Sequence, residues 1–343
     1  MFGVIIIKIM MSGGKTAGHI MPAIQIMKNF KEAEFYYAGS KEELEKNLTK
    51  GYIKEYLEYD LCGINRKKPF TIFKTIYFFN KAYHKAKNDL KKIKPDIVMG
   101  MGGNISAPLI LAAKKLKIKT VIHEQNVVYG LTNKYLKNKV DLVLLSFDSL
   151  SDGLVVGNPT QERVNNYQKT EIVYPKDYHK VLFIGGSLGA RLINELAVKI
   201  IEETRDLNIY YVLIVGNNYE VKKQYKNATI LKYTNDLNNI MQEVDLIISR
   251  AGASTIAEVI NIPKPLILIP SPNVTNNHQE KNASYLENRG LAKMIKESEA
   301  EEKLKKEMLD ILLSKTQIQN DGKGDAVWRI IEELKKMNYT DTF

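Results

Sequence analysis

The sequence predicts an α/β protein made of two Rossmann-like, doubly wound parallel-sheet domains that face each other across a cleft. Three observations support this prediction. Short β-branched runs alternate with helical patterns along the chain, and an order of strand, glycine loop and helix occurs at 5–24 and again at 181–197. The 343 residues also suffice for two domains of ordinary size.

The expected strands are continuous apolar runs rather than alternating ones, which is typical of strands buried on both faces of a parallel sheet. Five lie in the first half of the chain: Val4–Met10, Glu34–Ala38, Asp96–Met99, Thr120–His123 and Asp141–Ser146. Five lie in the second half: Val181–Ile184, Tyr210–Val215, Thr229–Lys232, Leu246–Ser249 and Leu266–Ile269. The helices between them supply the crossovers that parallel strands require.

The domain boundary is expected in the polar stretch Gln161–Asp177, which gives domains of 1–160 and 161–325. Two amphipathic helices then close the chain. Their apolar faces comprise Leu304, Met308, Ile311 and Leu312 in the first and Val327, Ile330, Ile331 and Leu334 in the second.

Composition limits the class of protein. With 44% hydrophobic and 26% charged residues the chain is globular, and the single cysteine, Cys62, excludes a disulfide framework and favours a reducing compartment. A net charge of +11 favours an anionic partner, which leaves nucleic acid, an anionic membrane and a phosphorylated substrate open. The apolar opening, Phe2–Met11, is too short to span a bilayer and runs into a glycine loop. The protein is therefore expected to be soluble or to lie on a membrane without crossing it.

The first glycine loop, Ser12–His19, follows the first strand directly. Its glycines would let the backbone approach a phosphate, with a helix N-terminus pointing there. The loop matches neither a Walker loop nor GxGxxG, and a tight turn without a ligand explains it equally well. A lone histidine is usually structural, but His19 lies at the carboxyl edge of a parallel sheet, where ligands bind.

Three stretches of the second half also join strands to helices. Gly185–Ala190 repeats the glycine loop, and Ser249–Glu258 carries small residues that free backbone N–H groups for an anion. Glu258 could accept hydrogen bonds from ribose hydroxyls, although a solvated or helix-dipole glutamate is the alternative. Pro270–Ala283 carries amides that could bind a sugar, or could simply cap a helix.

Two strand ends of the first half could form the wall of an acceptor pocket. These are Gly100–Asn104 and His123–Asn126. The alternative is a turn at the glycines and a hydrogen bond between His123 and Glu124.

A basic and aromatic patch covers residues 66–94. The patch contains ten lysines or arginines and one acid, a local net charge of +9. Interleaved with them are Phe70, Phe73, Ile76, Tyr77, Phe78, Phe79 and Tyr83. This combination suits an anionic lipid surface. A core helix with solvated lysines is the alternative, and stacking on single-stranded nucleic acid has no supporting motif.

Taken together, these motifs resemble the family of UDP-N-acetylglucosamine:lipid-linked muramyl-pentapeptide N-acetylglucosaminyltransferases of bacterial peptidoglycan synthesis. The matching segments follow the family's order and span nearly the whole chain. They are GGKTAGHIMP (13–22), GMGGNISAP (100–108), HEQNVVYGLTN (123–133), GNP (157–159), GGSLGARLIN (185–194), RAGASTIAE (250–258) and HQEKNA (278–283).

The resemblance implies a glycosyltransferase-B fold, an inverting reaction and a final helix, 326–343, that packs back on the first domain. It makes His19 the base for the acceptor hydroxyl, Glu258 the ligand of the ribose, and the backbone of Thr234 a contact of uracil. The implied donor site comprises Thr16, Ala17, Gly18, Asn126, Arg163, Ser187, Thr234, Ala253, Ser254, Thr255, Ile256, Ala257, Glu258 and Gln279.

The chain departs from the family pattern at two places. Lys15 stands where a glycine is usual, and Gln161 stands where the family commonly has an arginine two residues past GNP. Arg163 follows two residues later. The family arginine therefore has no counterpart at its usual position, and Arg163 is our hypothesis for the phosphate contact.

The resemblance names UDP-N-acetylglucosamine as donor and an undecaprenyl-linked muramyl pentapeptide as acceptor, at the cytoplasmic face of the membrane. We expect a peripheral protein that contacts the anionic inner-membrane surface through 66–94 and binds no nucleic acid. No tightly bound cofactor and no metal are expected, because no carboxylate cluster has metal-ligand spacing. Rival hypotheses are a transferase acting on diacylglycerol or another lipid, a UDP-sugar 2-epimerase, and a non-catalytic basic module that binds lipid or RNA.

Overall fold

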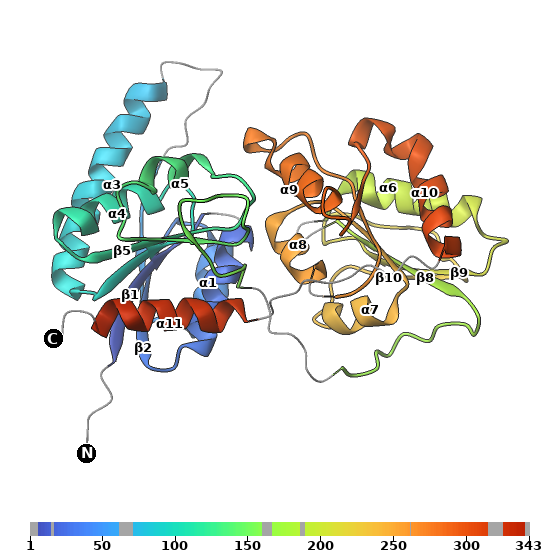
Figure 1. Ribbon diagram of the computed structural model, residues 1–343, viewed down its shortest axis with the longest axis horizontal. Coiled ribbons are helices and arrows are strands. Elements are labelled where there is room, and N and C mark those ends of the chain that lie inside the picture. The colour runs from blue at the N-terminus through green and yellow to red at the C-terminus, as the bar shows by residue number, and fades with distance from the viewer. Residues whose placement is uncertain are drawn as a thin grey trace. The chain divides into compact units, whose positions relative to one another are not determined.

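A computed structural model of the chain describes residues 6–14, 17–61, 71–159, 167–185, 189–260, 262–314 and 325–339. The chain divides into two compact units. Unit 1 comprises Met1–Glu162 and Asp325–Phe343, and unit 2 comprises Arg163–Gly324. Each unit is a parallel sheet between helices (Figure 1). The prediction of two doubly wound parallel-sheet domains is therefore confirmed in its fold class.

The sheet of unit 1 has seven parallel strands in the order β3-β2-β1-β4-β5-β6-β7. Their bounds are β1 Ile7–Ser12, β2 Ala33–Gly39, β3 Glu55–Glu58, β4 Ile97–Gly100, β5 Lys119–Glu124, β6 Leu142–Leu145 and β7 Leu154–Val155. The strand order reverses between β1 and β4, where Ser12 pairs with Gly100. Ligands of open α/β sheets bind outside the carboxyl ends of the strands at such a switch point.

Helices cover both faces of this sheet. They are α1 Ala17–Asn29, α2 Glu43–Thr49, α3 Thr71–Ile93, α4 Ser106–Lys115, α5 Leu131–Leu136 and α11 Ala326–Tyr339. On one face α1 and α11 share a core that includes Ile20, Ile24, Ile330 and Leu334. On the other, the second half of α3 packs on α4. Figure 1 shows α11, the last helix of the chain, beside α1.

Unit 2 repeats the arrangement with six parallel strands in the order β10-β9-β8-β11-β12-β13. Their bounds are β8 His179–Ile184, β9 Ile209–Ile214, β10 Ala228–Leu231, β11 Leu246–Ser249, β12 Leu266–Leu268 and β13 Lys293–Met294. The helices are α6 Arg191–Glu203, α7 Leu237–Glu243, α8 Ala253–Val259, α9 His278–Glu287 and α10 Ala300–Ser314. The switch point lies between β8 and β11, where Ile184 pairs with Ser249.

The ten predicted strands are all present, with ends that differ by a few residues. The first, expected at Val4–Met10, is Ile7–Ser12, and residues 1–5 lie outside the described part. Three short strands were missed: β3, β7 and β13. All three are edge strands. β3 has one buried side chain among four residues, and β7 and β13 have only two residues each, so none is a long buried apolar run.

Candidate functional site

His19 lies at the switch point of unit 1, in the first turn of α1. Two glycines hold its imidazole between two loops. A β-carbon on Gly14 would come within 2.7 Å of the ring atom Cδ2, and one on Gly102 within 3.0 Å of Cε1. The glycines that the sequence marks as a phosphate loop therefore make room for the histidine side chain.

The two loops also approach each other closely. Gly103 has a positive φ of 77°, and a β-carbon there would lie 2.5 Å from the Cα of Gly14. The backbone N–H of Met101 donates to the carbonyl of Ser12 at 2.7 Å. The 13–22 and 100–108 motifs are thus parts of one structure, because β1 and β4 are neighbours in the sheet.

The side chain of Gln125 connects His19 to the end of β5. The Nδ1 atom of His19 lies 3.1 Å from Oε1 of Gln125, and Nε2 of Gln125 donates to the carbonyl of Met101 at 3.0 Å. The same Nε2 lies 3.1 Å from Nδ1 of His123. Gln125 and His123 are both buried. The HEQN stretch thereby meets the glycine loops at the histidine.

His123 and Glu124 do not pair with each other, so that alternative is wrong. Nε2 of His123 donates to the carbonyl of Gly157 at 3.0 Å, and burial, with a smaller effect of His19, lowers the pKa of His123 to about 4. Glu124 accepts hydrogen bonds from Asn126, Gly130 and Asn133 instead. The carboxylate therefore shapes the loop that follows β5 and holds the side-chain amide of Asn126.

In unit 2 the predicted donor residues Ala253–Glu258 follow β11, and Gln279 follows β12. Residues Ala253–Glu258 form most of α8, which begins after Gly252. Oε1 of Gln279, in α9, accepts from the backbone N–H of Ser271 at 2.9 Å, and Asn282 donates to the carbonyl of Ala251 at 3.2 Å. The second bond connects the Ser249–Glu258 stretch to the Pro270–Ala283 stretch, and the first lies within Pro270–Ala283.

Glu258 is a carboxyl group in an unfavourable environment. Burial raises its pKa to about 7, although the side chain retains some exposure. A carboxylate that is short of water gains from hydroxyl donors, so the position suits a ligand with a diol. Arg250, between β11 and α8, does not contribute in this way. Its guanidinium donates to the carboxylate of Glu297 at 2.5 Å and to the carbonyl of Ile269 at 3.1 Å.

The remaining predicted residues have simpler positions. Gly18 lies in α1 beside His19, and Ala17 begins that helix. The hydroxyl of Thr234 accepts from the backbone N–H of Asp236 at 2.9 Å and shapes the turn before α7. Thr16, Arg163 and Ser187 lie outside the described residues, as do Lys15 and Gln161.

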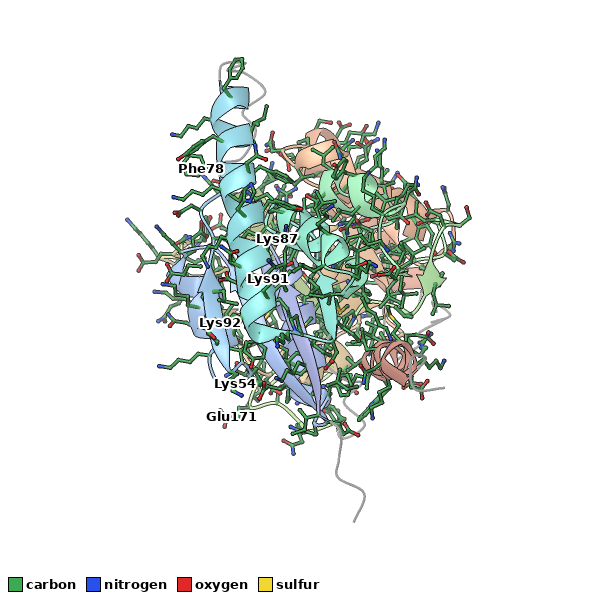
Figure 2. All side chains as sticks on the ribbon, turned by 90° about the vertical axis from the view of Figure 1, so that its left-hand side faces the viewer. Lys54, Phe78, Lys87, Lys91, Lys92 and Glu171 are labelled. Carbon is green, nitrogen blue, oxygen red and sulfur yellow. The ribbon has the colours of Figure 1, made fainter. Side chains whose placement is uncertain are left out.

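The basic patch begins in residues outside the described part and continues as α3. The described side chains of its first turns are not buried: Phe73 is 77% exposed, Ile76 53% and Tyr77 64%. Burial starts at Ala82, where the helix reaches α4. Figure 1 shows the first turns of α3 extending beyond α4 and α5, and Figure 2 shows Phe78, Lys87, Lys91 and Lys92 along this helix.

The described part of the chain contains neither a metal-binding cluster nor a membrane-spanning helix. No group of three or more His, Cys, Asp or Glu side chains there could hold a metal ion. Among the same residues, no helix combines the length and apolar character that crossing a bilayer requires.

Comparison with known proteins places both units in one family. Residues 9–145 match the glycosyltransferase family 28 N-terminal domain, and residues 180–334 match the glycosyltransferase family 28 C-terminal domain. A UDP-N-acetylglucosamine–N-acetylmuramyl-(pentapeptide) pyrophosphoryl-undecaprenol N-acetylglucosamine transferase of Bacillus cytotoxicus is 35% identical, over 96% of this chain and 99% of the relative.

Solved structures agree on the fold. The MurG crystal structure from Acinetobacter baumannii superimposes with a TM-score of 0.73 at 23% identity, covering 96% of this chain and 99% of that one. A UDP-N-acetylglucosamine 2-epimerase superimposes with a TM-score of 0.64 at 16% identity, covering 96% of this chain and 95% of that one. Since a transferase and an epimerase share the architecture, the fold alone does not distinguish the two activities.

Proposed function

The chain belongs to glycosyltransferase family 28, among the transferases that carry N-acetylglucosamine to lipid-linked muramyl pentapeptide, and on this premise we propose the following reaction. N-acetylglucosamine passes from UDP-N-acetylglucosamine to the 4-hydroxyl of undecaprenyl-pyrophosphate-linked muramyl pentapeptide, with inversion at the anomeric carbon. The observation that carries the proposal is the imidazole of His19, held between Gly14 and Gly102 at the carboxyl edge of the sheet.

His19 acts as the general base in this reaction. The acceptor hydroxyl attacks C1 of the sugar, its proton passes to the imidazole, and the bond from C1 to the pyrophosphate oxygen breaks. A positioned base contributes typically 100- to 10,000-fold to such a step. UDP leaves with the bonding electron pair, and backbone N–H groups and helix N-termini at the glycine loops stabilise the charge on its β-phosphate.

Unit 2 binds the donor. We assign the ribose hydroxyls to Glu258, uracil to the backbone of Thr234, and the remaining contacts to Ser187, to residues Ala253–Ala257 and to Gln279. Unit 1 would add contacts from Thr16–Gly18 and Asn126, and Arg163 would contact phosphate. The raised pKa of Glu258 supports its part of this assignment, because ribose hydroxyls would donate the hydrogen bonds that burial denies to the carboxylate.

Donor binding should therefore depend on pH through Glu258. Its pKa is about 7 in the free protein, and hydroxyl donors in the complex lower it by favouring the ionised form. Binding then releases a proton, so affinity falls below about pH 7, by at most tenfold per pH unit, and levels off above it. Calorimetric titration with UDP-N-acetylglucosamine between about pH 5.5 and 8.5 measures this.

The matched variant for this prediction is Glu258→Gln. It should bind the donor more weakly, with affinity independent of pH over the same range. Because folding raises the pKa of Glu258 from 4.5 to about 7, the wild-type protein loses stability as the pH rises from 4.5 to 7. The glutamine of the variant does not titrate, so the variant does not lose this stability. The variant should therefore unfold at a higher temperature than wild type above pH 7, and an equal pH dependence in both proteins would contradict the role of Glu258.

The choice of acceptor is tested by direct assay. With UDP-N-acetylglucosamine as donor, we expect product from the lipid-linked muramyl pentapeptide and none from diacylglycerol. Product from diacylglycerol alone would favour another lipid transferase, and conversion of the donor sugar without any acceptor would favour an epimerase. A basic binding module predicts that millimolar UDP leaves the melting temperature unchanged, whereas the proposed enzyme is stabilised by UDP.

We further propose that the protein is peripheral at the cytoplasmic face of the membrane and contacts its anionic surface through 66–94. The exposed Phe73, Ile76 and Tyr77 support this contact, since large apolar side chains on a basic helix gain from insertion among lipid headgroups. Lysines of the same helix add electrostatic attraction, each contributing on the order of 1 kcal/mol.

A further inference from the structure

We infer that Gln125 is a positioning residue for His19: its side-chain amide fixes the imidazole in the tautomer that carries its proton on Nδ1. The basic lone pair of the neutral ring then lies on Nε2. The consequence for catalysis rests on the proposed function, whereas the tautomer is a property of the protein alone.

The orientation of the Gln125 amide follows from its neighbours. One end of the amide faces the carbonyl oxygens of Met101 at 3.0 Å and His123 at 3.2 Å. Carbonyl oxygens only accept hydrogen bonds, so this end must be the NH₂ group. The other end is therefore the oxygen, and it faces Nδ1 of His19 at 3.1 Å. Because an amide oxygen also only accepts, Nδ1 of His19 must donate.

His123 stabilises this orientation from the far side. Its Nε2 faces the carbonyl of Gly157 and must carry the proton, so its Nδ1 is an acceptor for the NH₂ group of Gln125. Protonation of His123 would put two donors face to face. The low pKa of His123 keeps the ring neutral at physiological pH, so this fixed acceptor persists.

The glycine loops fix the ring of His19 while Gln125 fixes its proton. A β-carbon on Gly102 would lie 3.1 Å from Nδ1 and one on Gly14 2.7 Å from Cδ2, so the imidazole has little room to turn over. A ring flip would place carbon against the Gln125 oxygen and lose the hydrogen bond. The glycines thus limit the space of the ring, and the hydrogen bond to Gln125 sets its tautomer.

The chemical consequence concerns the direction of proton transfer. With its proton on Nδ1, neutral His19 can accept a proton only at Nε2. After transfer, the imidazolium still donates from Nδ1 to a neutral amide oxygen rather than to a carboxylate. The proton on Nε2 must then pass on to solvent or product, which restores the base for the next turnover.

The tautomer is tested in the free protein by nitrogen NMR of histidine labelled with ¹⁵N. The chain has five histidines, and the His19→Ala variant identifies the signals of His19. At alkaline pH we expect a protonated, pyrrole-like Nδ1 and a pyridine-like Nε2 in the wild type. In Gln125→Leu we expect the shifts to move toward a mixture of tautomers. A wild-type His19 protonated on Nε2 would overturn the inference, and this readout does not require any activity.

The catalytic consequence is tested by a double-mutant cycle. Gln125→Leu should lower kcat at least tenfold while KM for UDP-N-acetylglucosamine changes by less than about twofold, because Gln125 acts through the base. In the His19→Ala background the same substitution should have no further effect on kcat. The control is Gln25→Leu, which changes another buried glutamine of unit 1, in α1, and should leave kcat within about twofold of wild type.

Two results would overturn the positioning role. One is a loss in kcat of equal size in the wild-type and His19→Ala backgrounds, which would indicate a structural effect. The other is a Gln125→Leu variant with wild-type kcat. If the wild-type protein instead forms no product from the muramyl acceptor, the proposed function fails, and the NMR result still decides whether Gln125 sets the tautomer.

Discussion

Replacing His19 by Ala should lower kcat by about 100- to 10,000-fold, the range of a lost general base. The variant should keep its affinity for UDP within about twofold, because the residues assigned to the nucleotide lie mainly in unit 2. Steady-state kinetics with the lipid-linked acceptor and calorimetric titration with UDP measure the two quantities separately. A kcat within about twofold of wild type would remove His19 from the role of base.

The structure also suggests a rescue experiment for this variant. His19→Ala should leave a space between Gly14 and Gly102 that the ring occupied, and free imidazole has the size to fill it. Added imidazole should therefore restore part of kcat, and more at higher pH, where it is unprotonated. The matched control is His179→Ala, at the start of β8 in unit 2, which should have wild-type kcat and no response to imidazole.

Replacing Phe73, Ile76 and Tyr77 together by Ser should reduce binding to anionic vesicles by more than about 100-fold. Fully burying a large apolar side chain contributes roughly 1.5–3 kcal/mol, so three partly inserted side chains suffice for such a loss. The three are exposed, so the melting temperature should change little. Co-sedimentation with vesicles at low and high salt separates this apolar effect from that of the lysines, which salt screens.

A matched control lies on unit 2. Leu313, in α10, is 77% exposed like Phe73, and Leu313→Ser should leave vesicle binding unchanged. The triple variant should lose activity on acceptor embedded in vesicles but keep it on a water-soluble acceptor analogue. Vesicle binding equal to that of wild type would show that the exposed face of α3 does not contact lipid.

Much of the fold could be predicted because parallel strands buried on both faces are visible as apolar runs. The central strands β1, β4, β8 and β11 illustrate this, whereas β3 and β7 were missed because they are short edge strands with few buried side chains. The family and the enzyme class also followed from the motifs, and both are confirmed by the family 28 matches. The individual site residues remain predictions that the experiments above test.

The sequence predicted the glycines of the first domain as turns near a ligand and did not show that they surround a side chain. The 13–22 and 100–108 stretches each indicate a turn near a ligand, but neither shows that Gly14 and Gly102 enclose one histidine. Gln125 was seen only as part of HEQN, although the motif was singled out. The sequence shows only an amide near His123. That Gln125 also faces His19 becomes apparent only when the strand order is known.

The sequence by itself determined which residue types follow the strands: two glycine loops, a histidine, a glutamate on a short helix and a basic aromatic helix. It did so because backbone freedom, apolar periodicity and charge are local properties. Only the tertiary structure decided which of these ends meet. The strand order places β4 beside β1 and β5 beside β4, which brings Gly102 and Gln125 to His19. Contacts between residues about 100 apart in the chain depend on this order rather than on spacing.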